Sequence, residues 1–183
     1  MSVRGVFFDL GGTLFSYSGI RRATTPLLME AIRRMGISGE PPEISRAYQR
    51  ASREVSEEYA AKSFYLHRDL FRDTFVRFTD HVNGKFDEQD YTWYCSEQHN
   101  LVLSNLILKN DCRSTLQHLK EQGLYLSIVS NIDEDMLHPL VAREGLHEYL
   151  DDWTSSEAAG SCKPHLKFFE VSIEKSGLAA ENV

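Results

Sequence analysis

The sequence predicts an α/β protein in which a Rossmann-like parallel sheet core is interrupted by an all-helical cap domain. Short apolar runs that end in polar residues, a pattern typical of buried parallel strands, occur at the start of the chain and again beyond residue 105. The long stretch between them shows helical periodicity only, whereas an ordinary crossover between parallel strands holds one helix. We therefore assign residues 1–15 and 105–183 to the core and residues 16–104 to the cap.

The first strand, expected at about residues 3–8, ends in Asp9, and a glycine-rich turn with Gly11, Gly12 and Thr13 follows. Ligands of open α/β sheets lie beyond the carboxyl ends of the strands. A carboxylate in that position is costly to desolvate without a partner, and glycines let the backbone approach an anion closely. For this segment alone, a strand followed by a turn that Asp9 caps is an equal alternative.

Four helices are expected in the cap, with boundaries set by capping and breaking residues. They run from Thr25-Pro26 to Gly36, from about 44 to 62 after a Pro41-Pro42 connector, up to Asn83-Gly84, and from near Asp87 onward. Their aromatic side chains favour a bundle core over a substrate pocket.

Strand and helix alternate again in the last part of the chain. The expected elements are a helix from Asp111 to Gly123, a strand to Ser130, a helix from Asp133 to Gly145, a strand near 152–155 and a helix after Pro164. Ser130 and Asn131 end the middle strand, and Lys163 precedes the last helix. An aspartate nucleophile, a hydroxyl that holds an anionic oxygen and a lysine that offsets charge suit attack on an anionic substrate.

The segments FFDLGGTL, IVSN and CKP, in this order and each at an expected element boundary, resemble three motifs of the haloacid dehalogenase (HAD) superfamily. The resemblance runs from about residue 3 to the end of the chain and implies a helical cap of the C1 type. It implies that Asp9 is the nucleophile, that Ser130 binds the transferred group and that Lys163 stabilises both Asp9 and the substrate. By the same resemblance the further site residues are Asn131, Gly12 and Thr13 for substrate, and Asp9 with the Gly11 backbone carbonyl for Mg²⁺.

Two departures from the family pattern affect the expected activity. Phosphatases of the family usually carry a second Asp, a general acid and base, where this chain has Gly11. The acidic fourth motif that completes the Mg²⁺ site is expected after a strand near Asn182-Val183, where the sequence ends. We therefore expect weak Mg²⁺ binding and an open edge on the Asp9 strand, as in a truncated form or one covered by a second chain such as a homo-oligomer.

Three functions fit these residues. The first is a Mg²⁺-dependent phosphatase of a small phosphorylated metabolite, acting through an aspartyl intermediate on Asp9. The second is a non-catalytic binding or scaffold protein, favoured by Gly11 and the absent fourth motif, so an inactive 183-residue form is an alternative outcome. The third is a hydrolase of carbon–halogen bonds like the 2-haloacid dehalogenases, whose halide leaves without a proton.

The composition limits the expected binding partners and the expected cellular compartment of the protein. The net charge of −7 argues against a nucleic-acid surface, and the N-terminal apolar run is too short for a signal peptide or membrane span. The three cysteines are too scattered for a disulfide framework or zinc site, and reduced thiols are typical of the cytoplasm. We expect a cytoplasmic protein with a small-molecule substrate and no nucleic-acid or membrane partner.

Overall fold

The computed structural model describes residues 2–183, which form two compact units. Unit 1 comprises the chain up to Tyr17, Ser63–Leu66 and Ile107–Val183, and unit 2 comprises Ser18–Lys62 and His67–Leu106. The short segment Ser63–Leu66 lies in the sequence range expected for the cap but packs with unit 1. No helix in the described part of the chain is both long and apolar enough to span a bilayer.

Unit 1 is built on a parallel sheet of three strands in the order β1 (Gly5–Phe8), β4 (Tyr125–Ser130) and β5 (Asp152–Ser155). Phe8 pairs with Ile128, and Ser130 pairs with Ser155, so the carboxyl ends of all three strands lie at one edge. This arrangement confirms the α/β fold with a parallel sheet. β1 pairs only with β4 among the described residues, as expected for an open edge.

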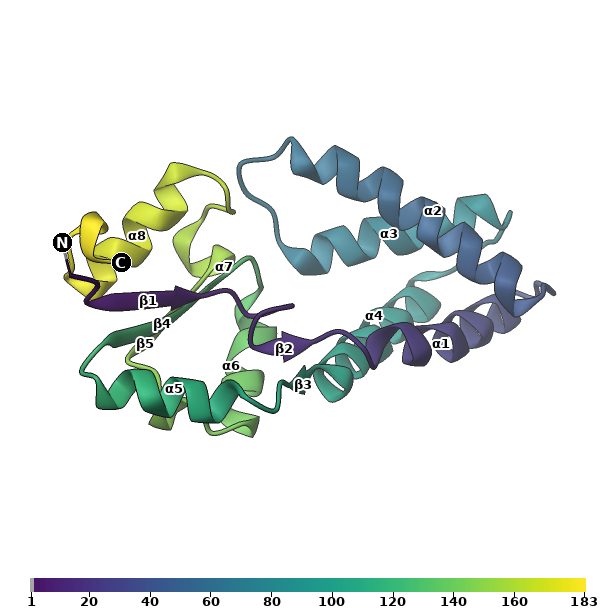
Figure 1. Ribbon diagram of the computed structural model, residues 1–183. Helices are drawn as coiled ribbons and strands as arrows, with labels where there is room; N and C mark the ends of the chain where they lie inside the picture. The colour runs from purple at the N-terminus through teal and green to yellow at the C-terminus, as the bar shows by residue number, and fades with distance from the viewer. Residues whose placement is uncertain (1) are drawn as a thin grey trace. The chain divides into compact units, whose positions relative to one another are not determined.

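Helices cover both faces of this sheet (Figure 1). α5 (Cys112–Glu121) and α6 (Glu134–Arg143) lie below it in that view, and α7 (Ser156–Ala159) and α8 (Leu166–Ser176) lie above. Two short 3₁₀ helices, η1 (Leu146–Glu148) and η2 (Ala180–Asn182), complete the unit. Leu126 and Ile128 of β4 and Phe168 of α8 are fully buried, so the predicted strand and the helix that covers it both contribute to the core.

A second ladder of unit 1 was not predicted. β2 (Phe15–Ser16) pairs antiparallel with β3 (Ile107–Leu108), and each strand has only two residues. Strands this short carry no detectable periodicity, and their partners are far apart in the sequence. The ladder matters for the site because it fixes the chain directly after the turn that follows β1.

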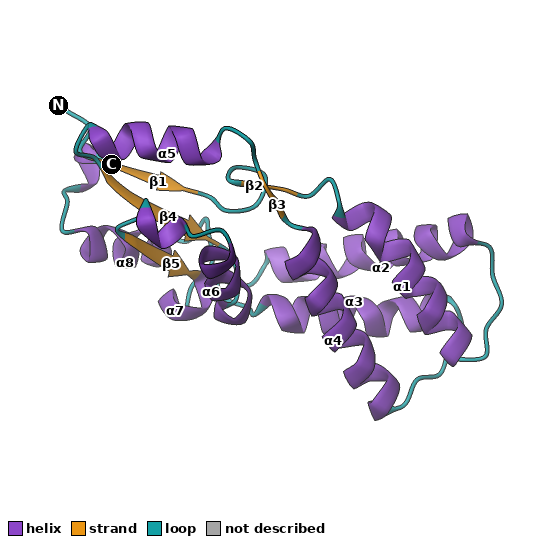
Figure 2. Cartoon of the chain, turned by 90° about the horizontal axis from the view of Figure 1, so that it is seen from below, coloured by secondary structure: helices purple, strands orange, loops and turns teal. Residues whose placement is uncertain are grey.

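Unit 2 is a bundle of four helices, seen clearly in Figure 2: α1 (Ile20–Arg34), α2 (Pro41–Ala60), α3 (His67–His81) and α4 (Glu88–Asn105). α1 packs against α4 and α2, and α3 packs against α2 and α4. Phe75, Phe78 and Tyr94 are buried in the centre, where the rings of Phe75 and Tyr94 stack at 3.7 Å. At Phe75 and Phe78 the structure therefore confirms the bundle-core interpretation of the aromatic pattern.

Two predicted helix starts were wrong. α1 begins at Ile20 and contains Pro26, because Gly19 at its start packs closely against Asn105 at the end of α4, a contact invisible to local capping signals. α2 begins at Pro41 itself, because N–H groups in the first turn of a helix have no intrahelical acceptor, so proline loses no hydrogen bond there. The predicted ends at Gly36 and Gly123 are confirmed by positive φ values of 70° and 76°.

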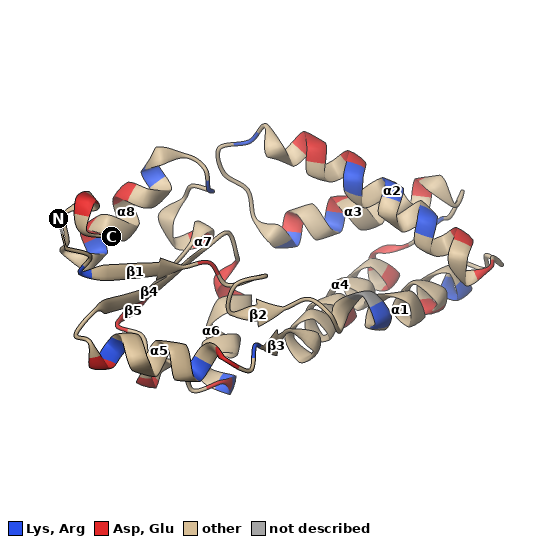
Figure 3. Ribbon diagram, in the orientation of Figure 1, with Lys and Arg blue, Asp and Glu red and all other residues tan. Residues whose placement is uncertain are grey.

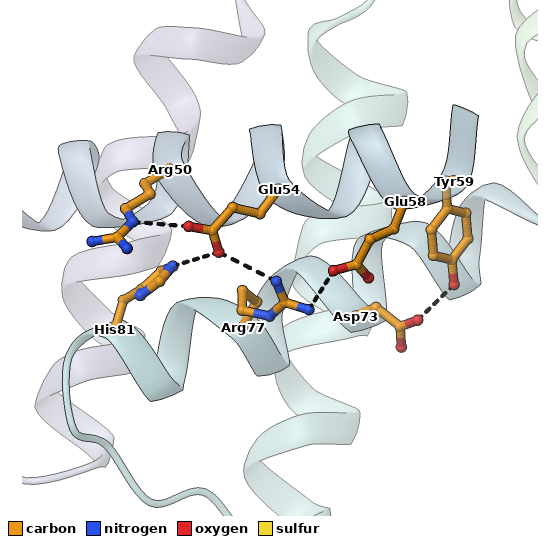
Figure 4. Close-up of polar contacts among 7 residues, drawn as sticks. All are labelled: Arg50, Glu54, Glu58, Tyr59, Asp73, Arg77 and His81. Carbon is orange, nitrogen blue, oxygen red and sulfur yellow. Dashed lines mark hydrogen bonds and ion pairs between the residues drawn. The ribbon is translucent and has the colours of Figure 1, made fainter. Parts of the chain in front are cut away.

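Positions with charged residues of both signs occur along α2 and α3, as the ribbon colours of Figure 3 show. They form a connected network across the two helices (Figure 4). Glu54 accepts hydrogen bonds from Arg50 at 2.8 Å and from Arg77 at 3.2 Å, and it lies 3.0 Å from His81. Further along, the Tyr59 hydroxyl donates to Asp73 at 2.6 Å. The network joins α2 to α3 on the outside of the aromatic core.

Candidate active site

Asp9 directly follows β1, at the edge of the sheet where the parallel strands end. Its side chain is 44% exposed, and its Oδ1 oxygen accepts two hydrogen bonds. The Ser130 hydroxyl donates at 2.8 Å and the Lys163 ammonium donates at 2.9 Å. The structure therefore brings together the three residues that the sequence placed at separate element boundaries. The Oδ2 oxygen of Asp9 accepts no side-chain hydrogen bond among the described residues.

Two opposing effects set the pKa of Asp9. Burial raises it, but the hydrogen bonds from Lys163 and Ser130 and the positive charge of Lys163 outweigh burial and hold the pKa of Asp9 below its ordinary value. The carboxylate is thus ionised throughout the neutral range. An ionised carboxylate with one free oxygen is a competent nucleophile.

Lys163 is fixed at both ends. Its ammonium group donates to the Val129 carbonyl at 2.9 Å as well as to Asp9. Its backbone is held by the Asn131 side chain, which accepts from the Lys163 N–H at 2.7 Å and donates to the Lys163 carbonyl at 3.1 Å. Asn131 was expected beside the substrate, but its oxygen and its amide nitrogen are both engaged by the Lys163 backbone.

The loop after β1 is held by its own backbone. Gly12 has a φ of 80°, and its N–H donates to the Phe15 carbonyl at 2.7 Å, so this amide is committed to the loop. The N–H groups of Gly11 and Thr13 and the Thr13 hydroxyl make no hydrogen bond among the described residues. The free donors of the loop are therefore those of Gly11 and Thr13.

One residue of this region was missed by the sequence analysis. Lys109 follows β3; its backbone N–H donates to the Leu14 carbonyl at 2.9 Å, and its ammonium group donates to the Gly12 carbonyl. Lys109 and Gly12 are 97 positions apart, so no local pattern connects them. The side chain ties the β1 loop to the β2–β3 ladder.

The loop that carries Lys163 has a second support within unit 1. Cys162 is buried, its N–H donates to the Ser63 carbonyl at 2.9 Å, and its thiol lies 3.6 Å from the Tyr65 carbonyl. The segment Ser63–Leu66 is thus bound to the residue just before Lys163. Cys162 thus has a packing role in this loop.

The oxygens at the end of β1 are the ligand type that Mg²⁺ prefers. The two candidate donors are the Asp9 carboxylate and the Gly11 carbonyl, and the Gly11 carbonyl accepts no hydrogen bond within residues 2–183. These two donors fit part of an octahedral shell and leave the other positions to water and substrate. In the same described range, no group of three or more His, Cys, Asp or Glu side chains is placed to hold a metal.

The family assignment rests on a comparison along almost the whole chain. A family profile described as haloacid dehalogenase-like hydrolase matches residues 3–183. The chain belongs to this family. This HAD-like hydrolase is 27% identical over 183 residues to the glyceraldehyde 3-phosphate phosphatase of Methanocaldococcus jannaschii, with 98% of the chain and 73% of the relative covered. Other distant relatives carry the names ribulose-1,5-bisphosphate 5-phosphatase and (S)-2-haloacid dehalogenase.

Solved structures share the fold of this HAD-like hydrolase. An L-2-haloacid dehalogenase from Xanthobacter autotrophicus, with chloropropionic acid covalently bound, superposes with a TM-score of 0.67 at 22% identity, covering 99% of this chain and 68% of that one. A Bacillus subtilis protein described as a HAD-hydrolase and bound to magnesium superposes with a TM-score of 0.75 at 16% identity, covering 100% and 76%. At these identities the likeness establishes the architecture, a parallel core with a helical cap.

Proposed function

We propose that this HAD-like hydrolase is a phosphatase of a small phosphorylated metabolite and that Asp9 is its nucleophile. The observation that supports the proposal is that the two oxygens of Asp9 have different surroundings. Ser130 and Lys163 both bind Oδ1, while Oδ2 is left without a side-chain partner. The held oxygen orients the carboxylate, and the other one is directed to the substrate.

The reaction then follows in two balanced steps. Oδ2 of Asp9 attacks phosphorus, the bond from phosphorus to the bridging ester oxygen breaks, and the departing oxygen takes up a proton from a solvent water. Water next attacks the phosphorus of the aspartyl phosphate, which releases inorganic phosphate and restores the carboxylate. Lys163 offsets negative charge throughout, and the free N–H groups of Gly11 and Thr13 donate to phosphoryl oxygens. A Mg²⁺ ion held by Asp9 and the Gly11 carbonyl would lower the repulsion between carboxylate and phosphate.

The proposed substrate class is supported by the relatives. Two curated relatives are named as phosphatases of small sugar phosphates, and both align with more than nine-tenths of this chain. The net charge of −7 does not oppose such substrates, because Lys163 and the loop N–H groups supply the local positive potential.

The test is hydrolysis of p-nitrophenyl phosphate and glyceraldehyde 3-phosphate with and without Mg²⁺. We expect Mg²⁺-dependent release of phosphate that Asp9→Asn abolishes, because the amide keeps the shape but loses the nucleophilic charge. Asp80→Asn, at an exposed aspartate of α3, is the matched control and should leave turnover unchanged. Turnover that survives Asp9→Asn would overturn the proposal.

A carbon–halogen hydrolase is the second candidate, because position 11 holds a glycine and a departing halide needs no proton. The same Asp9 oxygen would attack carbon in place of phosphorus. Release of chloride from 2-chloropropionate, independent of Mg²⁺ and lost in Asp9→Asn, would favour this function over the phosphatase. Absence of turnover with both substrate classes, in a protein that folds, would favour a non-catalytic binding protein.

A further inference from the structure

A tyrosine occupies the space that a side chain at position 11 would fill. A Cβ added to Gly11 would overlap the hydroxyl oxygen and Cζ of Tyr17 and would lie 3.0 Å from its Cε2. The same test at Gly12 finds no atom within 4 Å. The crowding is therefore specific to the contact between Gly11 and Tyr17, beside the nucleophile.

The turn after β1 brings Tyr17 to this place. The Leu10 carbonyl accepts hydrogen bonds from the N–H groups of Leu14 and Phe15, at 3.0 and 2.9 Å, and this closes the chain on itself. Tyr17 follows β2 directly, so the ring returns over Gly11. The backbone bonds that shape the turn thus also position the hydroxyl.

The Tyr17 hydroxyl is free to serve a ligand. The residue is 57% exposed, so packing into the apolar core does not explain where its ring lies. The hydroxyl makes no hydrogen bond within residues 2–183. A phenol hydroxyl is ordinarily neutral at physiological pH, so this group can donate a hydrogen bond.

We propose that the Tyr17 hydroxyl donates a hydrogen bond to the bridging oxygen of the phosphate ester, the oxygen that leaves with the product alcohol. The inference rests on the proposed phosphatase function. Negative charge grows on this oxygen as its bond to phosphorus breaks, so a donor stabilises the transition state more than the ground state. Ser130 and Lys163 already hold Asp9, which leaves this task to another residue. Glycine at position 11 is the residue that gives Tyr17 room to perform it.

Tyr17→Phe tests the proposal, because it removes the hydroxyl and keeps the ring. For an alkyl phosphate, whose alkoxide is a poor leaving group, kcat/KM should fall about 10²-fold, the effect of removing one donor to a developing oxyanion. For p-nitrophenyl phosphate, whose leaving group is stable as an anion, kcat/KM should stay nearly unchanged. Tyr149→Phe is the matched control, because Tyr149 precedes β5 and so lies toward the opposite end of the strands from Asp9.

The outcomes separate this inference from the proposed function. An equal loss with both esters, or no loss with either, in a protein that Asp9→Asn inactivates overturns the role of Tyr17 and leaves the phosphatase proposal standing. Activity that survives Asp9→Asn overturns both. A readout that needs no turnover is the affinity for inorganic phosphate in the presence of Mg²⁺, measured by calorimetry. It should weaken about tenfold in Tyr17→Phe, as expected for one lost hydrogen bond to an anion, and an unchanged affinity would overturn the inference.

Discussion

At the scale of single residues, the candidate site depends on how Lys163 is held. The ammonium group bridges Asp9 and the Val129 carbonyl, and the Asn131 side chain fixes the backbone of the same residue. A lysine side chain has considerable rotamer freedom, and restraint at both ends removes much of it before substrate arrives. Under the proposed function, Asn131 is therefore expected to act through Lys163, as a positioning residue.

We expect Asn131→Ala to impair both stability and turnover. The two hydrogen bonds to Lys163 are partly buried and contribute about 1–3 kcal/mol together to the free energy of unfolding. Turnover should fall about tenfold or more as the ammonium group moves away from Asp9. Urea denaturation and steady-state kinetics measure the two effects. Asn110→Ala, at an exposed asparagine of unit 1, should change neither, and an unaltered kcat in Asn131→Ala would contradict the positioning role.

At the scale of elements, α2 and α3 are joined by ion pairs outside their apolar contact. The hydrogen bond from Arg50, helped by those from Arg77 and His81, outweighs the opposing effect of burial and lowers the pKa of Glu54 to about 2. Glu54 keeps 28% of its side chain exposed, so solvent and salt screen these interactions. The network therefore makes a small contribution to the stability of the α2–α3 pair, and burial of the aromatic core provides most of it.

This network predicts a specific response to acid. Because the folded pKa of Glu54 lies below its unfolded value, the charged form stabilises unit 2 above the unfolded pKa, and this contribution is lost as pH falls toward 2. The thermal midpoint of the helical signal should therefore decline between about pH 5 and pH 2, and less so in Glu54→Gln. Glu57→Gln, on the same helix and without an ion pair in the described structure, should decline like the parent. Identical slopes in parent and Glu54→Gln would contradict the assignment.

The β1 strand has one edge that is not paired with another strand among the described residues. Among the described residues it pairs with β4 alone, and a cavity of about 470 Å³ runs beside it, lined by apolar residues of β1, α8 and the C-terminal end. Those lining residues include Val3, Val6, Phe7, Phe169, Ile173 and Val183. An edge strand next to an apolar groove is a site where another strand adds readily.

Hydrogen exchange measures whether this edge is covered. We expect the amides of β4 to exchange slowest in unit 1 and the β1 amides that do not face β4 to exchange much faster, because no backbone group within residues 2–183 pairs with them. Protection of those β1 amides that increases with protein concentration would instead indicate that a second copy covers the edge, the homo-oligomer alternative raised by the sequence. Sedimentation at the same concentrations provides the control.

At the scale of the whole molecule, the sequence predicted the sheet and the grouping of Asp9, Ser130 and Lys163 because their signals are local. Asp9, Ser130 and Lys163 each lie next to an element boundary, and parallel strands necessarily collect their carboxyl ends at one edge. The sequence did not predict the features of the site that depend on contacts between residues far apart in the chain. Lys109 reaches Gly12, and Cys162 reaches Tyr65, each across 97 positions, and the Tyr17 ring lies over Gly11 only because the chain turns back on itself.

Mg²⁺ and inorganic phosphate should bind cooperatively at the candidate site, and the thermal stability of the whole protein should report this coupling. Asp9 and the Gly11 carbonyl supply only part of a Mg²⁺ shell, so Mg²⁺ alone should raise the thermal midpoint little. Mg²⁺ with inorganic phosphate should raise it more than the sum of both alone, and saturation at about 100 times Kd corresponds to about 2.7 kcal/mol. Scanning calorimetry of the parent and of Asp9→Asn measures the coupling. A strictly additive response in the parent would contradict a shared site.

The contact between Gly12 and Lys109 also has a consequence for folding. Joining them in an unfolded chain closes a loop of 97 residues, but the ends of unit 2 meet where Gly19 lies against Asn105. Once the helical bundle has formed, the effective loop shrinks to roughly ten residues, and the entropy of closure falls by about 2 kcal/mol. We therefore expect the bundle to form before the β2–β3 ladder, and the turn beside Asp9 to acquire its final shape late. On this pathway, the candidate site around Asp9 takes its final shape only after the helical bundle has folded and brought residues 19 and 105 together.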